Sequence, residues 1–285
     1  ITGGSSGIGK ALVEECVKKK IKVFFTYNNN EIEALKLSKN KKNCFAIKAN
    51  LSSDVDIKNV FKVIKKKSES LDCLVNNAAQ RFEKKSFEKL DINTVIKNFD
   101  INVFGVYRCC LASIKLMKKN SLIINMSSTA AKFGGNNLTH YAPTKAAIEN
   151  LTIGLSRDLS KFNIRVVNVS PGIIDTKNMR QTNGINSKLQ IKELSSTIPS
   201  QRIGNSQEVA KVILWLNSKE ASYINGTTIT DERYEEIKKR GGLYLEKYVV
   251  SQPKVHTRPQ LINPPSGIQN IAEFKNFLNQ NRIVF

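Results

Sequence analysis

The amino-acid sequence predicts an α/β fold in which a doubly wound parallel sheet carries helices on both faces. Stretches with apolar residues at helical spacing alternate along most of the 285 residues with short runs rich in β-branched and aromatic residues. These runs are continuously apolar, as strands are when helices cover both faces of a parallel sheet. With 40% hydrophobic residues, the chain has enough apolar side chains to bury such a core.

The predicted elements follow one another in a regular order. A first helix extends from the glycine-rich stretch near the start to about Lys20, with apolar residues on one face. A polar turn at residues 27–30 follows the first apolar run. The expected strands are residues 21–26, 44–49, 71–75, 121–126, 164–169 and 227–230. The expected further helices are residues 31–38, 54–70, 92–118, 141–161 and 207–217.

The regular alternation ends near Thr230. Residues 231–285 hold four of the seven prolines, so we predict a domain over residues 1–230 and an atypical C-terminal extension with short helices near 232–240 and 271–278. At the other end, the glycine-rich stretch starts directly after Ile1. Because a strand must hold such a loop at a sheet edge, we expect a first strand that is largely missing and a sequence that is a fragment.

The net charge of +21 has two interpretations, a solvated basic surface or a site for a polyanion. We favour the first, because the lysines are spread along the chain and no zinc-finger, RNA-binding or basic-zipper signature supports nucleic-acid binding. No apolar run approaches the roughly 20 residues of a membrane span, and no leader pattern is present, so we expect a soluble, cytoplasmic protein.

The cysteines and histidines of the chain offer few ligands for a metal ion. The five cysteines form no CxxC pair, and their apolar neighbours predict buried, reduced thiols. Only His140 and His256 could supply imidazole ligands, so we expect no metal.

Residues 2–9 have the sequence TGGSSGIG and lead directly into the first predicted helix. Such a loop brings backbone N–H groups and the positive end of a helix against a pyrophosphate, and larger side chains would block that approach. A simple glycine turn before a helix remains the alternative, because the loop alone is a weak signal.

Tyr141 and Lys145 are four residues apart on a predicted helix and therefore share one face. An ammonium group beside a phenol lowers the phenol pKa from about 10 and makes it a proton donor or base near neutral pH. Tyr234 and Lys238 repeat the spacing, but only Tyr141 has Ser128 thirteen residues before it, just after an apolar strand. A solvated surface pair is the alternative interpretation.

The set of motifs resembles the short-chain dehydrogenase/reductase family, and particularly its 3-oxoacyl-(acyl carrier protein) reductase-like branch. The resemblance covers residues 1–230 and implies a Rossmann-type sheet. The matching motifs, in chain order, are TGGSSGIG at 2–9, NNAA at 76–79, DINV at 100–103, SS at 127–128, YAPTK at 141–145, PGIIDT at 171–176, IP, RIG and EVA within 198–210, and ASYING at 221–226.

The resemblance also implies roles for single residues. Tyr141 would pass a proton to or from the substrate oxygen, Ser128 would hydrogen-bond that oxygen, and Lys145 would lower the tyrosine pKa and hold the nicotinamide ribose. Asn102 would hold a water molecule in a proton relay behind the lysine. The implied cofactor-binding residues are Thr2, Gly3, Ser5, Ser6, Gly7, Ile8, Gly9, Tyr27, Asn28, Asn50, Leu51, Asn77, Ala78, Tyr141, Lys145, Pro171, Gly172, Ile174 and Thr176.

Departures from the family pattern bear on the cofactor and the assembly. NAD enzymes of this type place an acidic residue at the end of the second strand for the ribose 2′-hydroxyl. Tyr27 and Asn28 stand there, so no carboxylate would repel a 2′-phosphate and we favour NADP over NAD. Ser6 and Asn28 are not basic, however, so NAD stays the alternative. We expect a homo-oligomer, and the residues after Thr230 leave dimer and tetramer open.

The expected function is hydride transfer between NADP(H) and a carbonyl or secondary alcohol. A 3-oxoacyl thioester on an acidic acyl carrier would suit the basic surface, while sugar, steroid and other alcohols stay open. Residues 177–201 are expected to form a mobile lid over the substrate. A silent dinucleotide-binding sensor or scaffold is the alternative, and a Ser128–His140 hydrolase is disfavoured because no G-x-S-x-G elbow is present.

Overall fold

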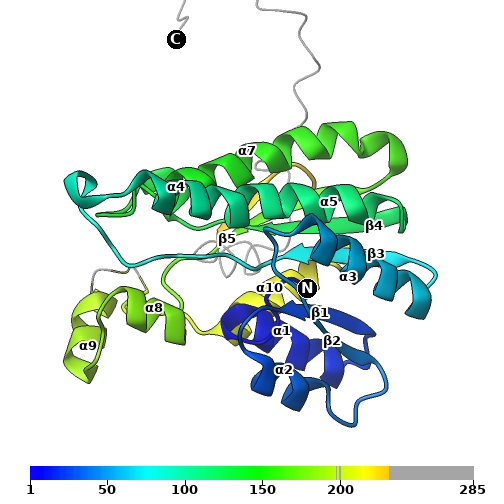
Figure 1. Ribbon diagram of the computed structural model, residues 1–285, viewed down its shortest axis with the longest axis horizontal. Helices are drawn as coiled ribbons and strands as arrows, with labels where there is room; N and C mark the ends of the chain where they lie inside the picture. Colours follow the sequence, from blue (N-terminus) through cyan, green and yellow to red (C-terminus); the bar gives the residue numbers. More distant parts are fainter. Residues whose placement is uncertain (197, 199, 231–285) are drawn as a thin grey trace, which may run out of the picture. The chain divides into compact units, whose positions relative to one another are not determined.

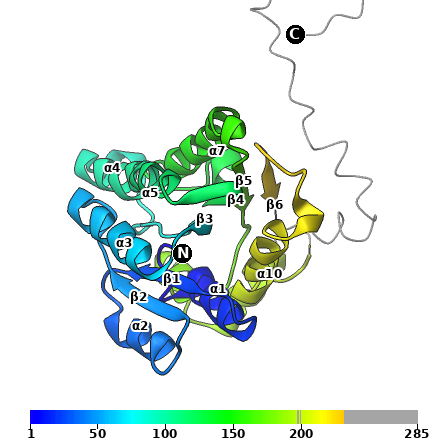
Figure 2. The ribbon, with the colours of Figure 1, turned by 90° about the vertical axis from the view of Figure 1, so that its right-hand side faces the viewer.

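The structure is a computed structural model, and it describes residues 1–230 except 197 and 199. Parallel strands form two groups, with β1 beside β2 and the order β3-β4-β5-β6 in the other group (Figures 1 and 2). This parallel sheet with helices on both sides confirms the predicted fold class. The strands are β1 (Val23–Tyr27), β2 (Cys44–Lys48), β3 (Leu71–Asn76), β4 (Met117–Met126), β5 (Arg165–Ser170) and β6 (Thr228–Thr230).

Helices cover both faces of the strands (Figure 2). On one face, the buried apolar side chains of α1, α2 and α10 form a core with β1, β4 and β5. On the other face, α3, α5 and α7 pack against β3 and β4 through a second apolar cluster. The α-helices are α1 (Gly7–Lys18), α2 (Glu31–Ser38), α3 (Asp54–Lys67), α4 (Ile92–Phe99), α5 (Gly105–Ile114), α6 (Ala130–Phe133), α7 (Ala142–Asp158), α8 (Lys177–Thr182), α9 (Lys188–Ser196) and α10 (Ser206–Leu216). Single 3₁₀ turns lie at η1 (Phe87–Lys89), η3 (Ser160–Phe162) and η4 (Lys219–Ala221).

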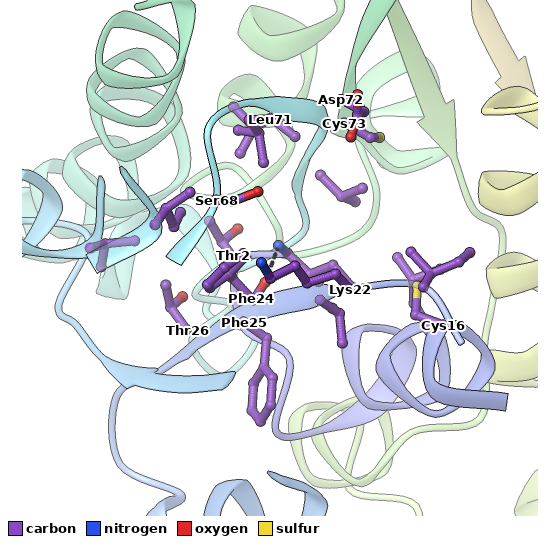
Figure 3. Close-up of a pocket in the computed structure, with 18 of the residues that line it drawn as sticks. Thr2, Cys16, Lys22, Phe24, Phe25, Thr26, Ser68, Leu71, Asp72 and Cys73 are labelled. Atoms are coloured by element: carbon purple, nitrogen blue, oxygen red, sulfur yellow. Dashed lines mark hydrogen bonds between the residues drawn. The ribbon is translucent and has the colours of Figure 1, made fainter. Parts of the chain in front are cut away.

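The two groups of strands are joined through the first residues of the chain. The Thr2 N–H donates to the Val75 carbonyl at 2.9 Å, and the Thr26 N–H donates to the Ile1 carbonyl at 3.0 Å. Ile1 and Thr2 therefore lie between β1 and β3 and hydrogen-bond to both. Beyond them, β1 and β3 are separated by a cavity of about 430 Å³, lined mainly by apolar side chains of β1, β3, α1 and α3 (Figure 3).

Most predicted boundaries fall within a few residues of the observed ones, but three differ in ways that matter. The first helix ends at Lys18, because Lys20 takes a left-handed backbone with φ of 59°. The helical stretch predicted to reach residue 118 ends at Ile114, since Met117 already pairs with Leu71 in the sheet. Tyr27, predicted to start a polar turn, is the last residue of β1 and is buried.

A π-helical turn, η2 (Asp100–Phe104), lies between α4 and α5. The sequence pattern predicted a single helix over residues 92–118 instead. Such turns are rare and occur frequently at functional sites. It places Asn102 in a fully buried position between the two helices.

The cysteines behave as predicted within this fold. Four of the five are buried, and burial raises the pKa of Cys73, Cys109 and Cys110 to about 12, which keeps these thiols protonated. In the part of the chain that the structure describes, no group of three or more His, Cys, Asp or Glu side chains could hold a metal ion. No helix among these residues is long and apolar enough to cross a membrane. The helices predicted after residue 230 lie outside the described residues.

Candidate active site

A pocket of about 170 Å³ lies at the carboxyl ends of the central strands, where ligands bind in open parallel sheets. Six segments of the chain line it. The loop after β3 contributes Ala79 and Arg81, the loop after β4 contributes Ser127 and Ser128, and the start of α7 contributes Tyr141. The remaining lining residues, from α1, the loop after β5 and α8, are Ile8, Pro171, Gly172, Ile174, Thr176, Asn178 and Met179.

The glycine loop beside this pocket requires its glycines. Gly3 and Gly7 have φ of +66° and +51°, a backbone region that residues with a Cβ rarely adopt. A Cβ on Gly9 would lie 2.2 Å from the Gly3 carbonyl oxygen, so α1 can start here only with glycine. The result is a tight turn that ends in the first N–H groups of a helix, which is the geometry a pyrophosphate needs.

Thr2 and Asn77 lock this loop onto the end of β3. The Thr2 hydroxyl accepts hydrogen bonds from the N–H groups of Asn77 and Ala78, both at 2.9 Å. The Asn77 side-chain amide donates back to the Thr2 carbonyl at 2.9 Å and to the Gly3 carbonyl at 3.2 Å. These predicted cofactor residues therefore fix the shape of the loop.

Helix α1 has an open N-terminus. Its N-cap residue, Ser6, is extended and makes no side-chain cap hydrogen bond. The methyl group of Thr176 lies 3.3 Å from where a Gly7 side chain would begin, so the loop after β5 faces the glycine loop. Unpaired N–H groups and a cradle that a side chain would fill together fit the phosphates of a dinucleotide.

Four of the implied cofactor-binding residues lie at the ends of β1 and β2. Tyr27 packs into the core, and its hydroxyl donates to the Glu31 carboxylate at 3.2 Å. Asn28 is exposed directly after it, and is better placed to meet a ligand. The Asn50 side-chain oxygen accepts a hydrogen bond from the Ser52 N–H at 3.1 Å, and Leu51 is buried.

Tyr141 occupies the N-cap position of α7, with Pro143 in the first turn as expected. Its side chain is buried, with only 8% exposed, and a hydrogen bond links its phenol to Ser128. The Lys145 ammonium lies 5.7 Å from the centre of the Tyr141 ring and donates to the Met126 carbonyl at 2.7 Å. The structure thus brings the three residues predicted for proton transfer together.

Burial controls the protonation of this group. It raises the pKa of Tyr141, an effect partly offset by the positive charge of Arg81 and by the Ser128 hydrogen bond. It also lowers the pKa of Lys145 to about 8. That Lys145 lowers the pKa of Tyr141 stays a prediction, whereas Arg81 and Ser128 are placed to do so.

Asn102 connects the loop after β3 to the start of α7. Its side chain accepts from the Gln80 N–H at 2.7 Å and donates to the Gln80 carbonyl at 2.8 Å. The same amide lies 3.2 Å from the Thr144 hydroxyl, which in turn donates to the Tyr141 carbonyl at 2.6 Å. Its predicted role of holding a water molecule stays a prediction.

Arg81 lines the pocket but was not among the residues predicted from the sequence. An arginine five residues after a strand gives no signal of its own, because such residues usually lie on a solvated surface.

The alternative of a Ser128–His140 hydrolase is not supported, because Ser128 contacts the Ala130 N–H and Tyr141. The segment predicted to form a lid, residues 177–201, contains α8 and α9, and its residue Met179 lines the pocket. The mobility of this segment stays a prediction.

A glycine loop at the end of a parallel sheet, beside a serine, a tyrosine and a lysine, defines a dinucleotide-dependent oxidoreductase. Residues 3–231 match the family described as Enoyl-(Acyl carrier protein) reductase. The chain is 34% identical over 240 residues to the uncharacterized oxidoreductase YgfF of Escherichia coli, a match that covers 80% of this chain and 96% of that protein.

Solved structures agree with this match. A short-chain dehydrogenase/reductase from Brucella melitensis, described as a glucose/ribitol dehydrogenase, superposes with a TM-score of 0.74 at 31% identity, over 80% of this chain and 92% of that one. A short-chain dehydrogenase from Burkholderia cenocepacia in complex with NADP superposes with a TM-score of 0.72 at 27% identity, over 81% and 94%. The chain belongs to the short-chain dehydrogenase/reductase family and is an NAD(P)-dependent oxidoreductase.

Proposed function

We propose that this protein transfers a hydride between NADP(H) and a carbonyl or secondary alcohol group, with Tyr141 as the proton donor or base. The observation that carries the proposal is one pocket lined by Ser128, Tyr141 and the loop after β5, next to the open N-terminus of α1. Chemistry at a carbonyl carbon needs a proton at the oxygen while hydride is delivered to the carbon.

The residues around the loop fit a dinucleotide. Backbone N–H groups of residues 5–9 would hold the pyrophosphate, Asn28, Asn50 and Leu51 would lie on the adenosine side, and Ile174 and Thr176 would meet the nicotinamide end. When bound, the cofactor supplies or accepts the hydride. NADP is favoured because residues 27–29 hold no carboxylate, and the related Burkholderia protein contains NADP.

The chain's own side chains would handle the proton and the oxygen. The Tyr141 hydroxyl would donate to the substrate oxygen during reduction, and the Ser128 hydroxyl would stabilise the charge that develops there. Lys145, anchored on the Met126 carbonyl, would hold the ribose and keep a positive charge behind the phenol. Asn102 would keep the loop after β3 in place and form the start of a water relay.

The substrate class is tested most directly with a short 3-oxoacyl thioester. The description of the matched family refers to acyl carrier protein, and a net charge of +21 would suit an acidic carrier. Sugar alcohols are a second class to test, because the related Brucella protein is named for glucose and ribitol. An acyl carrier as partner and a cytoplasmic location remain predictions.

We propose a second copy of this chain as the partner for the helical stretch from α4 to α5. Large apolar side chains are exposed along it, and Leu111 is 66% exposed. A folded protein that leaves several such residues in one region uncovered usually buries them against a partner. The exposed residues are Ile92, Ile96, Phe104, Tyr107 and Leu111. Light scattering should show that Leu111→Lys dissociates the assembly, and a wild-type monomer would contradict the proposal.

The deciding experiment measures the consumption of NADPH and NADH with a short 3-oxoacyl thioester, an aldehyde and a sugar substrate. We expect turnover with at least one of them and a higher kcat/KM with NADPH. Fluorescence of bound NADPH is recorded in parallel. Binding of NADPH without turnover on any substrate would contradict the proposal and support a silent dinucleotide-binding module.

A further inference from the structure

We propose that Arg81 binds a carboxylate group of the substrate, close to the carbonyl that is reduced. The physiological substrate would then be a short oxo acid or hydroxy acid rather than a neutral ketone or thioester. This inference rests on the proposed function and narrows its substrate class.

Arg81 lies at the reacting group. Its guanidinium carbon is 5.7 Å from the centre of the Tyr141 ring, and it lines the same pocket as Ser128 and Tyr141. A small molecule whose oxygen meets the Tyr141 hydroxyl therefore lies within reach of the guanidinium. The nicotinamide would take up part of the pocket of about 170 Å³, beside Ile174 and Thr176, and the space that remains favours a short molecule, since pockets for drug-sized ligands measure roughly 300–1,000 Å³.

Arg81 has no carboxylate partner among the residues that the structure describes. Its Nε is buried without a hydrogen-bond partner there, and one of its terminal nitrogens donates to the Asn183 side-chain oxygen at 3.3 Å. Glu83, two residues away, forms no ion pair with it in the described part. A desolvated cation with an open donor is costly unless an anion arrives to pair with it.

Other arginines of the fold show the contrast. Arg108 pairs with Asp54 and Asp100, and Arg180 pairs with Asp175. Arg165, which is also partly buried, donates to three backbone carbonyls between 2.9 and 3.1 Å. Of these four arginines, Arg81 is the one beside Tyr141, and its Nε has no hydrogen-bond partner among the described residues.

The neighbours of Arg81 are basic as well. Burial and the charge of Arg81 lower the pKa of Lys84, and burial, Arg81 and Lys85 lower the pKa of His140. The contributions of Arg81 and Lys85 to these shifts come from repulsion between like charges that lie close together, and a bound anion would relieve that repulsion. The region therefore attracts a negative group, and the forked guanidinium matches the two oxygens of a carboxylate.

The loop that carries Arg81 is held in place. Asn102 makes hydrogen bonds to both the N–H and the carbonyl of Gln80, the residue before Arg81. Through Thr144 the same side chain is linked to the backbone of Tyr141. Arg81 and Tyr141 are therefore fixed relative to one another, as selection of a short substrate with two recognition points requires.

The test compares 3-oxobutanoate with the neutral S-(3-oxobutanoyl)-N-acetylcysteamine, which presents the same ketone without the carboxylate. We expect the wild type to prefer the carboxylate, and Arg81→Met to lower kcat/KM for it about 100-fold, since charge-assisted hydrogen bonds contribute about 1.5–3 kcal/mol. The loss for the thioester should be at least tenfold smaller, because the thioester loses only the effect of Arg81 on the pKa of Tyr141. Lys132→Met, which removes an exposed cation from α6, is the matched control and should change neither.

A binding measurement makes the test independent of turnover. Saturation-transfer NMR should detect 3-oxobutanoate on the wild type and not on Arg81→Met, with partial recovery in Arg81→Lys, while NADPH affinity stays unchanged and the melting temperature does not fall. Equal losses for both substrates, or unchanged binding of 3-oxobutanoate, would overturn the inference. Turnover of the thioester alone would also overturn it and leave the proposed function standing. Absence of turnover with every carbonyl would instead count against the proposed function.

Discussion

The guanidinium carbon of Arg81 lies 5.7 Å from the centre of the Tyr141 ring, the same distance as the ammonium nitrogen of Lys145. The two cations act on the phenol differently. Arg81 lowers the pKa of Tyr141 against the opposing effect of burial, whereas the Lys145 ammonium is engaged by the Met126 carbonyl. The proton chemistry of the pocket therefore depends on a residue outside the Ser128, Tyr141 and Lys145 group.

Removal of the Tyr141 hydroxyl should abolish most of the activity. We expect Tyr141→Phe to lower kcat about 10²–10⁴-fold, the range for loss of a general acid or base. NADPH affinity, measured by fluorescence titration, should change less than twofold, because the ring still fills its buried position. Tyr223→Phe, at a tyrosine that is 79% exposed, is the matched control. Retained turnover in Tyr141→Phe would remove the tyrosine from the proton-transfer role.

A carboxylate at position 28 should change the cofactor preference. Asn28 is exposed at the end of β1, whereas Tyr27 is buried, so an aspartate is better introduced at 28. We expect Asn28→Asp to shift the ratio of kcat/KM values toward NADH by at least about tenfold, because a carboxylate repels the 2′-phosphate and accepts from the 2′-hydroxyl. Asn28→Arg should shift it toward NADPH. If neither ratio moves, the ribose pocket lies elsewhere.

The buried charge of Lys145 should lower the free energy of unfolding at neutral pH. Burial lowers its pKa from 10.5 to about 8, so at pH 7 the folded state carries a desolvated charge. Between pH 8 and 10.5 the unfolded chain binds more protons at this group than the folded one, and stability rises with pH. Lys145→Met should therefore be more stable than the wild type at pH 7. The penalty relieved is on the order of 3 kcal/mol, less about 1 for the lost hydrogen bond.

Urea unfolding at pH 7 and pH 10 measures this effect. The advantage of Lys145→Met should shrink at the higher pH, where the folded wild type no longer carries the charge, and activity should be lost at both. Lys62→Met, at an exposed lysine of α3, should leave the unfolding free energy nearly unchanged at either pH. A destabilised Lys145→Met at pH 7 would show that the ammonium is well compensated in the fold.

Because a cavity separates β1 from β3, residues added before Ile1 should raise the melting temperature. Five apolar, β-branched residues placed before Ile1 should extend the strand-like contacts of Ile1 and Thr2 with both neighbours and fill part of the 430 Å³. Filled cavity volume stabilises by about 24 cal/mol per Å³, so the melting temperature should rise by several degrees or more. A Gly-Ser extension of equal length is the control. Equal melting temperatures would contradict the expected first strand.

The sequence predicted what depends on local pattern. Alternating helices and continuously apolar strands indicated the fold class, and the positions of Ser128 and Tyr141 after a strand and at a helix start brought both to one pocket. Arg81 could not be found this way, because it stands out by having no counter-ion among the described residues, a property of its surroundings in space. The early end of the helix at Ile114 depends on the pairing of Met117 with Leu71, a contact between distant residues.

The π-helical turn at Asp100–Phe104 makes the structure sensitive to the insertion or deletion of a single residue at this place. A π turn accommodates one residue more than the α-helical turn it replaces, and each residue of an α-helix advances the direction of a side chain by about 100°. Deletion of a single residue within this turn would let α4 and α5 join as one regular helix and rotate the two segments relative to one another. Asn102 would then lose its two hydrogen bonds to the Gln80 backbone, although no residue of the pocket had been replaced. Relatives that differ by one residue here would therefore diverge in function more abruptly than their percentage identity indicates.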